Sequence, residues 1–219
     1  MLLEGPRVIE EAVRQGAHLT LLAVAEGLSF DALADVRVRL TSRSAAVVGT
    51  TVTTQGIVAI AHEPRATVTT ALGRARAAGW PLVVLDAVQD PGNVGAICRT
   101  AAAAGAPAVV LLDGSADAFG AKAVRAAAGA TFGLAVARGT WDDLRGCTGY
   151  GAVAHGGEAL EACPLEACDL LCLGSEVHGL RRSDLRPLTI PMAPGVESLN
   201  VAAAAAVLLF EFRRRLAVR

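Results

Sequence analysis

The alternation of strand and helix is clearest in W-P-L-V-V-L-D-A-V-Q-D-P-G-N-V-G-A-I-C-R-T-A-A-A-A-G-A-P-A-V-V-L-L, residues 80–112. The apolar run at Leu82–Leu85 is typical of a buried strand, and a polar loop follows it. We expect a helix over about Val94–Ala104 and a second buried strand at Ala108–Leu112. Alternating strands and helices with wholly apolar strands are typical of parallel sheets.

The same alternation continues to the end of the chain. Further strands are expected at Phe132–Val136, Gly151–Ala154 and Leu170–Leu173, and helices at Ala121–Ala128, Trp141–Arg145, Leu180–Leu185 and Leu199–Arg215. The sequence therefore predicts an α/β fold, with a mostly parallel sheet that carries helices on both faces.

The region before residue 66 has its own pattern and predicts a small N-terminal α/β domain over residues 1–65. A helix is expected at Pro6–Gln15, strands at Leu19–Val24, Val36–Leu40 and Gly56–Ala61, and a helical turn at Phe30–Ala34. Residues 66–79 are interpreted as a linker and short helix, and residues 80–219 as the larger domain.

Composition places the chain among globular proteins, since 53% of its 219 residues are hydrophobic and 19% are charged. A net charge of −1 argues against a generally basic surface for nucleic acid. Nineteen arginines accompany a single lysine, Lys122. Arginine suits phosphate recognition, but a GC-rich genome explains the same bias, so a local basic patch stays open.

Cysteine and histidine usage favours neither disulfides nor a metal. The five cysteines form no C-x-x-C pair, and the four histidines are scattered. The N-terminus lacks the features of a signal peptide. The apolar run Val201–Phe210 is about half of the ~20 residues that span a membrane. We expect a soluble cytoplasmic protein with no metal and no membrane association.

Three polar loops are candidates for function, because ligands of parallel sheets bind at loops after the carboxyl ends of strands. They follow Leu85, Leu173 and Ile190. In the first, a turn precedes Asn93, which is expected to cap the next helix, and Arg99 lies nearly two turns into that helix. Taken alone, this loop is better explained by a capped helix with an ordinary surface arginine, because Asn caps are common.

The second and third loops contain further polar candidates. Gly174 and Glu176 follow a strand, although a solvated Glu in a plain turn is an alternative. Ser198 is expected to cap the last helix, with Asn200 just inside it. Burial of Asn200 beside an alanine-rich helix is costly without partners, which favours a ligand or a second polar loop nearby.

Motifs of the main rival sites are absent from the sequence. No G-x-G-x-x-G follows a strand, and there is neither a G-x-x-x-x-G-K-[ST] phosphate loop nor a G-x-S-x-G elbow. Dinucleotide redox chemistry, phosphate-loop chemistry and serine hydrolysis are therefore disfavoured.

The three loops resemble, in order and spacing, the three motifs of the SpoU/TrmH family of SPOUT-class RNA 2′-O-methyltransferases. The matching stretches are N-V-G-A-I-C-R-T-A (residues 93–101), L-G-S-E-V-H-G-L (173–180) and I-P-M-A-P-G-V-E-S-L-N-V-A (190–202). The resemblance covers about residues 80–215. The stretches E-G-P-R-V-I-E-E-A and T-T-Q-G-I-V-A-I-A resemble the ribosomal-protein-like RNA-binding domain of many members. Departures are Val177 and His178, where a glycine is frequent, and Ala202, where a serine is frequent.

The resemblance implies methyl transfer from S-adenosylmethionine to a ribose 2′-hydroxyl of RNA, a C-terminal trefoil knot and a homodimer. It also implies catalytic roles for Arg99, Asn93, Glu176, Ser198 and Asn200. The cofactor-binding residues are Leu173, Gly174, Glu176, Ile190, Met192, Ser198 and Leu199. The RNA-binding candidates are Arg125, Arg37, Arg39 and Arg43.

The RNA partner and the activity leave alternatives open. Ribosomal RNA is favoured over transfer RNA because of the N-terminal domain. A non-catalytic RNA-binding or ribosome-assembly relative is a second interpretation, which the intact polar residues of the motifs disfavour. An α/β enzyme with another nucleotide is a third, disfavoured by the missing phosphate-loop motifs.

Overall fold

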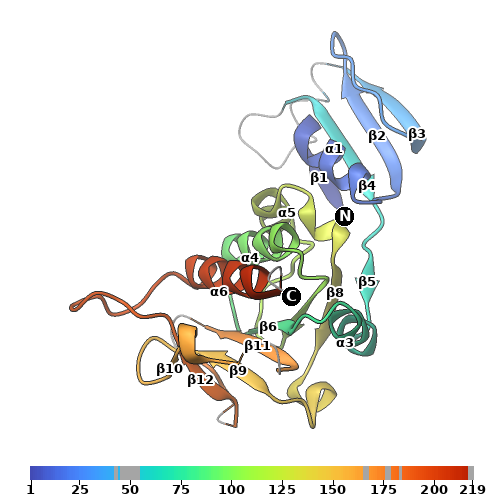
Figure 1. Cartoon of the computed structure of the whole chain (residues 1–219). Coiled ribbons are helices and arrows are strands. Elements are labelled where there is room, and N and C mark those ends of the chain that lie inside the picture. The colour runs from blue at the N-terminus through green and yellow to red at the C-terminus, as the bar shows by residue number, and fades with distance from the viewer. Residues whose placement is uncertain (42–43, 45–54, 165–167, 176–178, 183, 217–219) are drawn as a thin grey trace.

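The computed structural model of the chain describes residues 1–41, 44, 55–164, 168–175, 179–182 and 184–216. Its strands form two sheets, a smaller one near the N-terminus and a larger one that carries most of the helices (Figure 1). The smaller sheet contains β1 (Leu2–Glu4), β2 (Leu19–Ala25), β3 (Ala34–Leu40) and β4 (Ile57–Ala61), in the order β1-β4-β2-β3. Helix α1 (Pro6–Arg14) packs on one of its faces.

The predicted N-terminal helix and strands are confirmed to within a few residues, whereas the helical turn at Phe30–Ala34 is wrong. That segment is extended, because Ala34 already pairs with Leu19 at the start of β3. Phe30 packs against the core beneath α1. Tertiary pairing has therefore overridden the local helical pattern.

The larger sheet has eight strands, and every described pair in it is parallel. The strands are β5 (Arg65–Ala66), β6 (Leu82–Asp86), β7 (Ala108–Leu112), β8 (Ala135–Gly139), β9 (Gly149–Ala152), β10 (Glu158–Ala159), β11 (Leu170–Gly174) and β12 (Arg186–Thr189). Their order is β10-β12-β9-β11-β6-β7-β8-β5. The predicted mostly parallel α/β fold is confirmed.

Helices lie on both faces of this sheet, which explains why its central strands are apolar throughout. The helices are α3 (Val68–Ala77), α4 (Pro91–Ala104), α5 (Ala121–Ala127) and α6 (Val201–Leu216), with 3₁₀ turns η1 (Ala130–Gly133), η2 (Trp141–Leu144) and η3 (Leu160–Ala162). Leu82 and Val84 of β6 face the core under α3, whereas Val83 and Leu85 face the core under α4 and α6. No helix among the described residues is long and apolar enough to cross a membrane.

Several boundaries differ from the predictions. The chain across Leu180–Leu185 forms no helix in its described residues, because the Arg181 main chain bonds to Asp86 instead. Strand β8 begins after Phe132, which belongs to the 3₁₀ turn η1. Strands β10 and β12 were not predicted. Both are short, and β12 contains Pro187, a residue that argues against a strand in sequence patterns.

The two sheets are joined by direct packing. Val124 of α5 and Phe132 of η1 belong to the core of the smaller sheet. A Cβ at Gly129 would lie 2.7 Å from the Val8 carbonyl oxygen of α1, so this contact leaves no room for a side chain.

Segment 66–79, interpreted as a linker and short helix, supplies α3 and part of β5 to the larger sheet. The division at residue 65 into two domains stays a prediction.

Helices α4 and α6 run parallel and in contact. Their N-termini meet where the Asn200 side chain donates to Asn93, and their C-termini meet where the Arg213 guanidinium donates to the Ala104 carbonyl at 3.0 Å. Helix α4 also approaches α5 closely, since a Cβ at Gly95 would lie 2.1 Å from the Ala123 carbonyl oxygen. Gly95 is thus a packing position within the first motif.

We expect Gly95→Ala to lower the free energy of unfolding by about 1–3 kcal/mol, because the new methyl forces α4 and α5 apart. Gly73→Ala is the matched control: Gly73 also lies in a helix, but a Cβ there meets nothing within 4 Å. That variant should gain about 0.5–1 kcal/mol from helix propensity. Urea unfolding followed by circular dichroism measures both. Equal stability of the two variants would contradict the packing argument.

Candidate functional site

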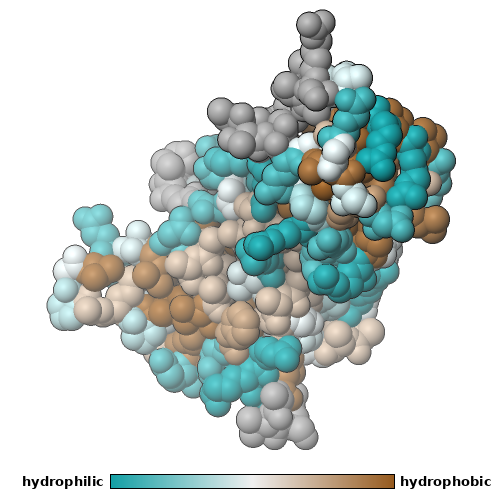
Figure 2. All heavy atoms as spheres, turned by 90° about the horizontal axis from the view of Figure 1, so that it is seen from above, coloured by the Kyte–Doolittle hydropathy of each residue, from teal (hydrophilic) through white to brown (hydrophobic). Residues whose placement is uncertain are grey.

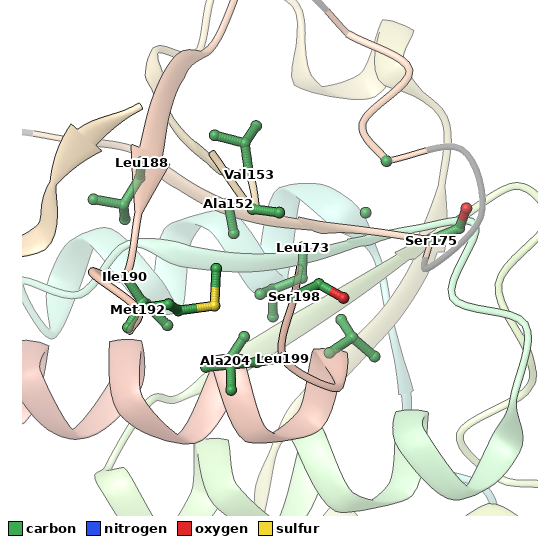
Figure 3. A pocket seen from close by; sticks show the side chains of 14 residues that line it. Ala152, Val153, Leu173, Ser175, Leu188, Ile190, Met192, Ser198, Leu199 and Ala204 are labelled. Atoms are coloured by element: carbon green, nitrogen blue, oxygen red, sulfur yellow. The ribbon is translucent and has the colours of Figure 1, made fainter. Parts of the chain in front are cut away.

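A cavity of about 250 Å³ opens at the carboxyl edge of the larger sheet, where the ends of β9, β11 and β12 meet the start of α6 (Figure 3). Six of the predicted cofactor-binding residues line it: Leu173, Gly174, Ile190, Met192, Ser198 and Leu199. The seventh, Glu176, lies outside the described residues. The structure therefore brings the described parts of the second and third loops together around one cavity.

Other lining residues were not predicted. Ala152, Val153 and Ala154 extend from the end of β9, and Leu188, Val201 and Ala204 complete the apolar wall. The end of β9 could be placed here only from the strand order, which puts β9 between β11 and β12. Among the labelled side chains in Figure 3, only Ser175 and Ser198 carry an oxygen, so the rest of the polarity comes from backbone groups.

The loop after β11 folds directly back onto the strand end. A Cβ at Gly174 would lie 2.4 Å from the carbonyl carbon and oxygen of Gly179, so only glycine fits there. The Gly179 amide donates to the Ser175 carbonyl at 2.9 Å and closes the loop. Gly179 has φ +63°, in the left-handed region that glycine adopts without strain. Ser175 and Gly179 thereby become part of the cavity wall.

A buried ion pair that the sequence did not reveal lies beside this loop. The Asp86 side chain, fully buried at the end of β6, accepts from the Arg181 amide at 2.8 Å and from its guanidinium at 2.7 Å. The Arg181 guanidinium also donates to the Asp113 carbonyl oxygen at 2.6 Å. Arg181 therefore contacts the ends of two neighbouring strands, β6 and β7.

The first loop is capped differently from the prediction. The Asp90 carboxylate, not Asn93, caps α4 and accepts from the amides of Gly92 and Asn93. The helix begins at Pro91, because proline is favoured in the first turn after a cap. Lys122 of α5 binds the same carboxylate at 3.1 Å and, with the backbone bonds, lowers the pKa of Asp90.

Asn200, rather than Ser198, caps α6. Its side-chain oxygen accepts from the Ala202 and Ala203 amides at 2.9 and 3.3 Å, while its Nδ2 donates to Asn93 Oδ1 at 3.1 Å. Asn200 is exposed, so the expected burial is wrong. The hydrogen-bond partner of Asn200 nonetheless comes from a second polar loop, because Asn93 lies where the first loop enters α4.

Arg99 lies on the exposed side of α4 and does not line the cavity. Among the residues that the structure describes, none forms an ion pair with it. Its guanidinium is thus available to an external anion. Of the predicted catalytic residues, the structure brings Asn93 and Asn200 together and places Ser198 in the cavity.

The RNA-binding candidates that the structure describes do not line the cavity. Arg37 pairs with Asp31 at 2.5 Å, and Arg39 donates to the Leu28 carbonyl at 2.7 Å; both lie on the exposed edge strand β3. Arg125 of α5 pairs with Glu4 at 4.0 Å. Arg43 lies outside the described residues.

Neither thiol chemistry nor a metal centre is indicated in the described part of the chain. Burial raises the pKa of the Cys98 thiol to about 12 and also raises the pKa of Cys172, so both stay protonated at neutral pH. No three His, Cys, Asp or Glu side chains among the described residues are grouped to hold a metal ion.

These features define an α/β protein with a cavity suited in size to a small organic ligand at the carboxyl edge of a parallel sheet. A profile of the SpoU rRNA Methylase family matches residues 81–210. The chain is 35% identical to the 23S rRNA (guanosine(2553)-2′-O)-methyltransferase of Bacillus subtilis, over 97% of this chain and 88% of that protein. It is 31% identical to the mitochondrial rRNA methyltransferase 3A of Danio rerio, over 99% of this chain and 64% of that protein.

Solved structures agree over nearly the whole chain. The SpoU methyltransferase AviRb from Streptomyces viridochromogenes, in complex with AdoMet, has a TM-score of 0.82 at 25% identity, covering 100% of this chain and 91% of that one. An AdoMet-bound rRNA methyltransferase from Sinorhizobium meliloti has a TM-score of 0.80 at 25% identity, covering 98% and 87%.

The chain belongs to the SpoU rRNA methylase family. The family profile spans more than half of the chain, and the alignment with the Bacillus relative covers 97% of the chain. The predicted family, enzyme class and cofactor are thereby confirmed: the protein is an S-adenosylmethionine-dependent RNA 2′-O-methyltransferase. The roles of individual site residues stay predictions.

Asn200 has two separable tasks, capping α6 and holding Asn93. We expect Asn200→Ala to lose about 1 kcal/mol of stability with the cap. Asn200→Ser keeps a capping oxygen but is too short to bond Asn93, so its stability should stay near that of the wild type. Methyl transfer should fall in both variants. Full transfer by Asn200→Ser would show that the bond to Asn93 has no part in the reaction.

Proposed function

We propose that the chain methylates a ribose 2′-hydroxyl of ribosomal RNA in the cytoplasm and that the described cavity holds the cofactor. The observation that carries the proposal is the convergence of six motif residues on one cavity at the sheet edge. Relatives named as 23S rRNA (guanosine-2′-O-)methyltransferases favour ribosomal over transfer RNA and guanosine as the target nucleoside.

The residues present fit S-adenosylmethionine. Aliphatic side chains of Leu173, Ile190 and Leu199 offer flat apolar walls for an adenine ring. Backbone groups of Gly174 and the Ser198 hydroxyl are placed for polar edges of the ligand. When bound, the cofactor supplies an electrophilic methyl group on a sulfonium. The chain's own groups must then align the acceptor hydroxyl and assist loss of its proton.

The proposed role of Arg99 is to bind the substrate RNA. A guanidinium stays protonated in proteins, so it cannot serve as a simple base, but it stabilises negative charge that develops on the ribose oxygen or holds the adjoining phosphate. The exposed position of Arg99 on α4 suits contact with a large external substrate. Asn93, six residues earlier on the same helix, accepts a hydrogen bond from Asn200 at 3.1 Å. Glu176, outside the described residues, is the candidate that accepts the proton indirectly.

RNA binding is assigned to the smaller sheet and α5. Arg37 and Arg39 project from an edge strand whose residues are mostly exposed, and a phosphate can compete with the surface contacts that they make. Arg125 of α5 pairs with Glu4 of the smaller sheet, and its side chain remains partly exposed. These arginines offer planar forks suited to phosphates.

A C-terminal trefoil knot and a homodimer complete the proposal. For the knot, support comes from the cavity itself, because Ile190, Met192, Ser198 and Leu199, which precede α6, line the same cavity as Ser175 and Gly179 after β11. For the dimer, support comes from Ala203, Val207 and Phe210, which lie on one exposed side of α6, Val207 being 43% and Phe210 49% exposed. Figure 2 shows apolar residues gathered towards the left of the molecule, where α6 and the preceding segment lie. Exposed apolar stripes of this kind mark interfaces.

Phe210→Asp should convert the dimer to a monomer, because the carboxylate would be desolvated at the centre of the interface. Sedimentation velocity measures the change. Leu33→Asp, at a residue that is 91% exposed just before β3, is the control and should leave the dimer intact. A wild-type monomer, or a dimer in Phe210→Asp, would contradict the proposed interface.

The assay of function is transfer of labelled methyl from S-adenosylmethionine to purified ribosomal and transfer RNA. Arg99→Ala should reduce turnover by about 100-fold or more through lost charge stabilisation. Its affinity for the cofactor should stay unchanged in calorimetry, because Arg99 does not line the cavity. Arg145→Ala, which removes an exposed arginine paired only with Asp142 in the described chain, is the control.

Transfer to transfer RNA alone would contradict the proposed substrate. Cofactor binding without transfer to any RNA would favour a non-catalytic relative. Full turnover by Arg99→Ala would remove Arg99 from the mechanism.

A further inference from the structure

Arg181 connects residues 179–182, here called the cofactor loop, to the sheet at several points. The residue lies two positions after Gly179, whose main chain forms a bridge with Ser175. Its amide and guanidinium both bond Asp86, which pairs in register with Gly174 of the adjacent strand β11. Its guanidinium also reaches the Asp113 carbonyl beyond the end of β7. One side chain thus spans the strand ends beside the cavity.

The two partners of this ion pair differ in burial. The Asp86 side chain is 0% exposed, whereas the Arg181 side chain is 44% exposed. A buried carboxylate that loses its partner carries a large desolvation penalty, while a half-exposed guanidinium is readily hydrated. Movement of the loop away from the sheet would leave Asp86 unpaired. The charge of Asp86 therefore favours the closed loop.

Closure of the loop sets one wall of the cavity. Gly179 sits on Gly174 with no space for a Cβ, and Leu180 lies over Gly151, where a Cβ would be 2.1 Å from Leu180 Cδ1. Ser175 and Gly179 both line the cavity. If Arg181 moved away from Asp86, Leu180 and Gly179 would move with it. The shape of this cavity wall would then change.

We propose that Arg181 is a positioning residue, whose ion pair with Asp86 holds the cofactor loop closed before the cofactor binds. The proposal rests on the proposed cofactor site. It assigns Arg181 to the internal architecture of the site. A wall that is already in place at binding avoids the entropy cost of ordering the loop, so the ion pair contributes to cofactor affinity without contact with the cofactor.

The test compares Arg181→Gln, Arg181→Lys and the double variant Asp86→Asn/Arg181→Gln with the wild type. Arg182→Gln is the matched control, since the neighbouring Arg182 pairs with Asp184 and stacks over Trp141, away from Asp86. Calorimetry with S-adenosylmethionine gives the Kd, and thermal unfolding without cofactor gives the stability. Hydrogen exchange of the residue-181 amide, also without cofactor, reports closure of the loop.

We expect Arg181→Gln to raise the Kd by about tenfold or more and to speed exchange of that amide. Turnover at saturating cofactor should change far less than the Kd. Arg181→Lys should recover part of the affinity, because it restores the charge but not the second donor. The double variant should bind better than Arg181→Gln, since it removes the unpaired carboxylate. Arg182→Gln should match the wild type.

Lower thermal stability with an unchanged Kd in Arg181→Gln would overturn the positioning role and leave only a structural one. Unchanged amide exchange would also overturn it. Failure of the wild-type chain to bind S-adenosylmethionine would instead contradict the cofactor site on which the proposal rests.

Discussion

The close contact between Gly174 and Gly179 is the constraint on which the rest of the site depends. With a side chain at residue 174, the loop after β11 could not lie on the end of its own strand. Because it does lie there, its ends become one wall of the cavity, and Arg181 comes within reach of the Asp86 carboxylate. A glycine at each side of the turn thus sets the shape of the ligand site and the pairing of the buried charge beneath it.

The helices bring the second part of the site into place through small residues. Gly95 lets α4 approach α5, and the alanine-rich start of α6 lets it lie beside α4 with the two N-termini level. Level N-termini put Asn93 and Asn200 within hydrogen-bond distance and leave Arg99 on the exposed surface of α4. The cavity and the exposed surface of α4 around Arg99 are therefore separate, which suits the proposed arrangement of a small cofactor in one and a large RNA on the other.

Sequence reasoning succeeded where one local cause decides the structure. The apolar runs at Leu82–Leu85 and Ala108–Leu112 predict strands because both faces of those strands are covered. The cavity residues were predictable from motifs that follow strand ends. The Asp86–Arg181 pair was not, because it joins residues 95 positions apart and needs the strand order to be known. The helix caps were misplaced by two or three residues, since Asp90, Asn93, Ser198 and Asn200 are all suitable caps and only the helix geometry selects among them.

The most direct test of the account is a crystal structure of the chain with S-adenosylhomocysteine, the product of methyl transfer. The account predicts the ligand in the cavity, with its adenine between Leu173, Ile190 and Leu199 and with the Asp86–Arg181 pair intact beneath the loop. A ligand bound elsewhere on the molecule, with this cavity left without it, would contradict the account.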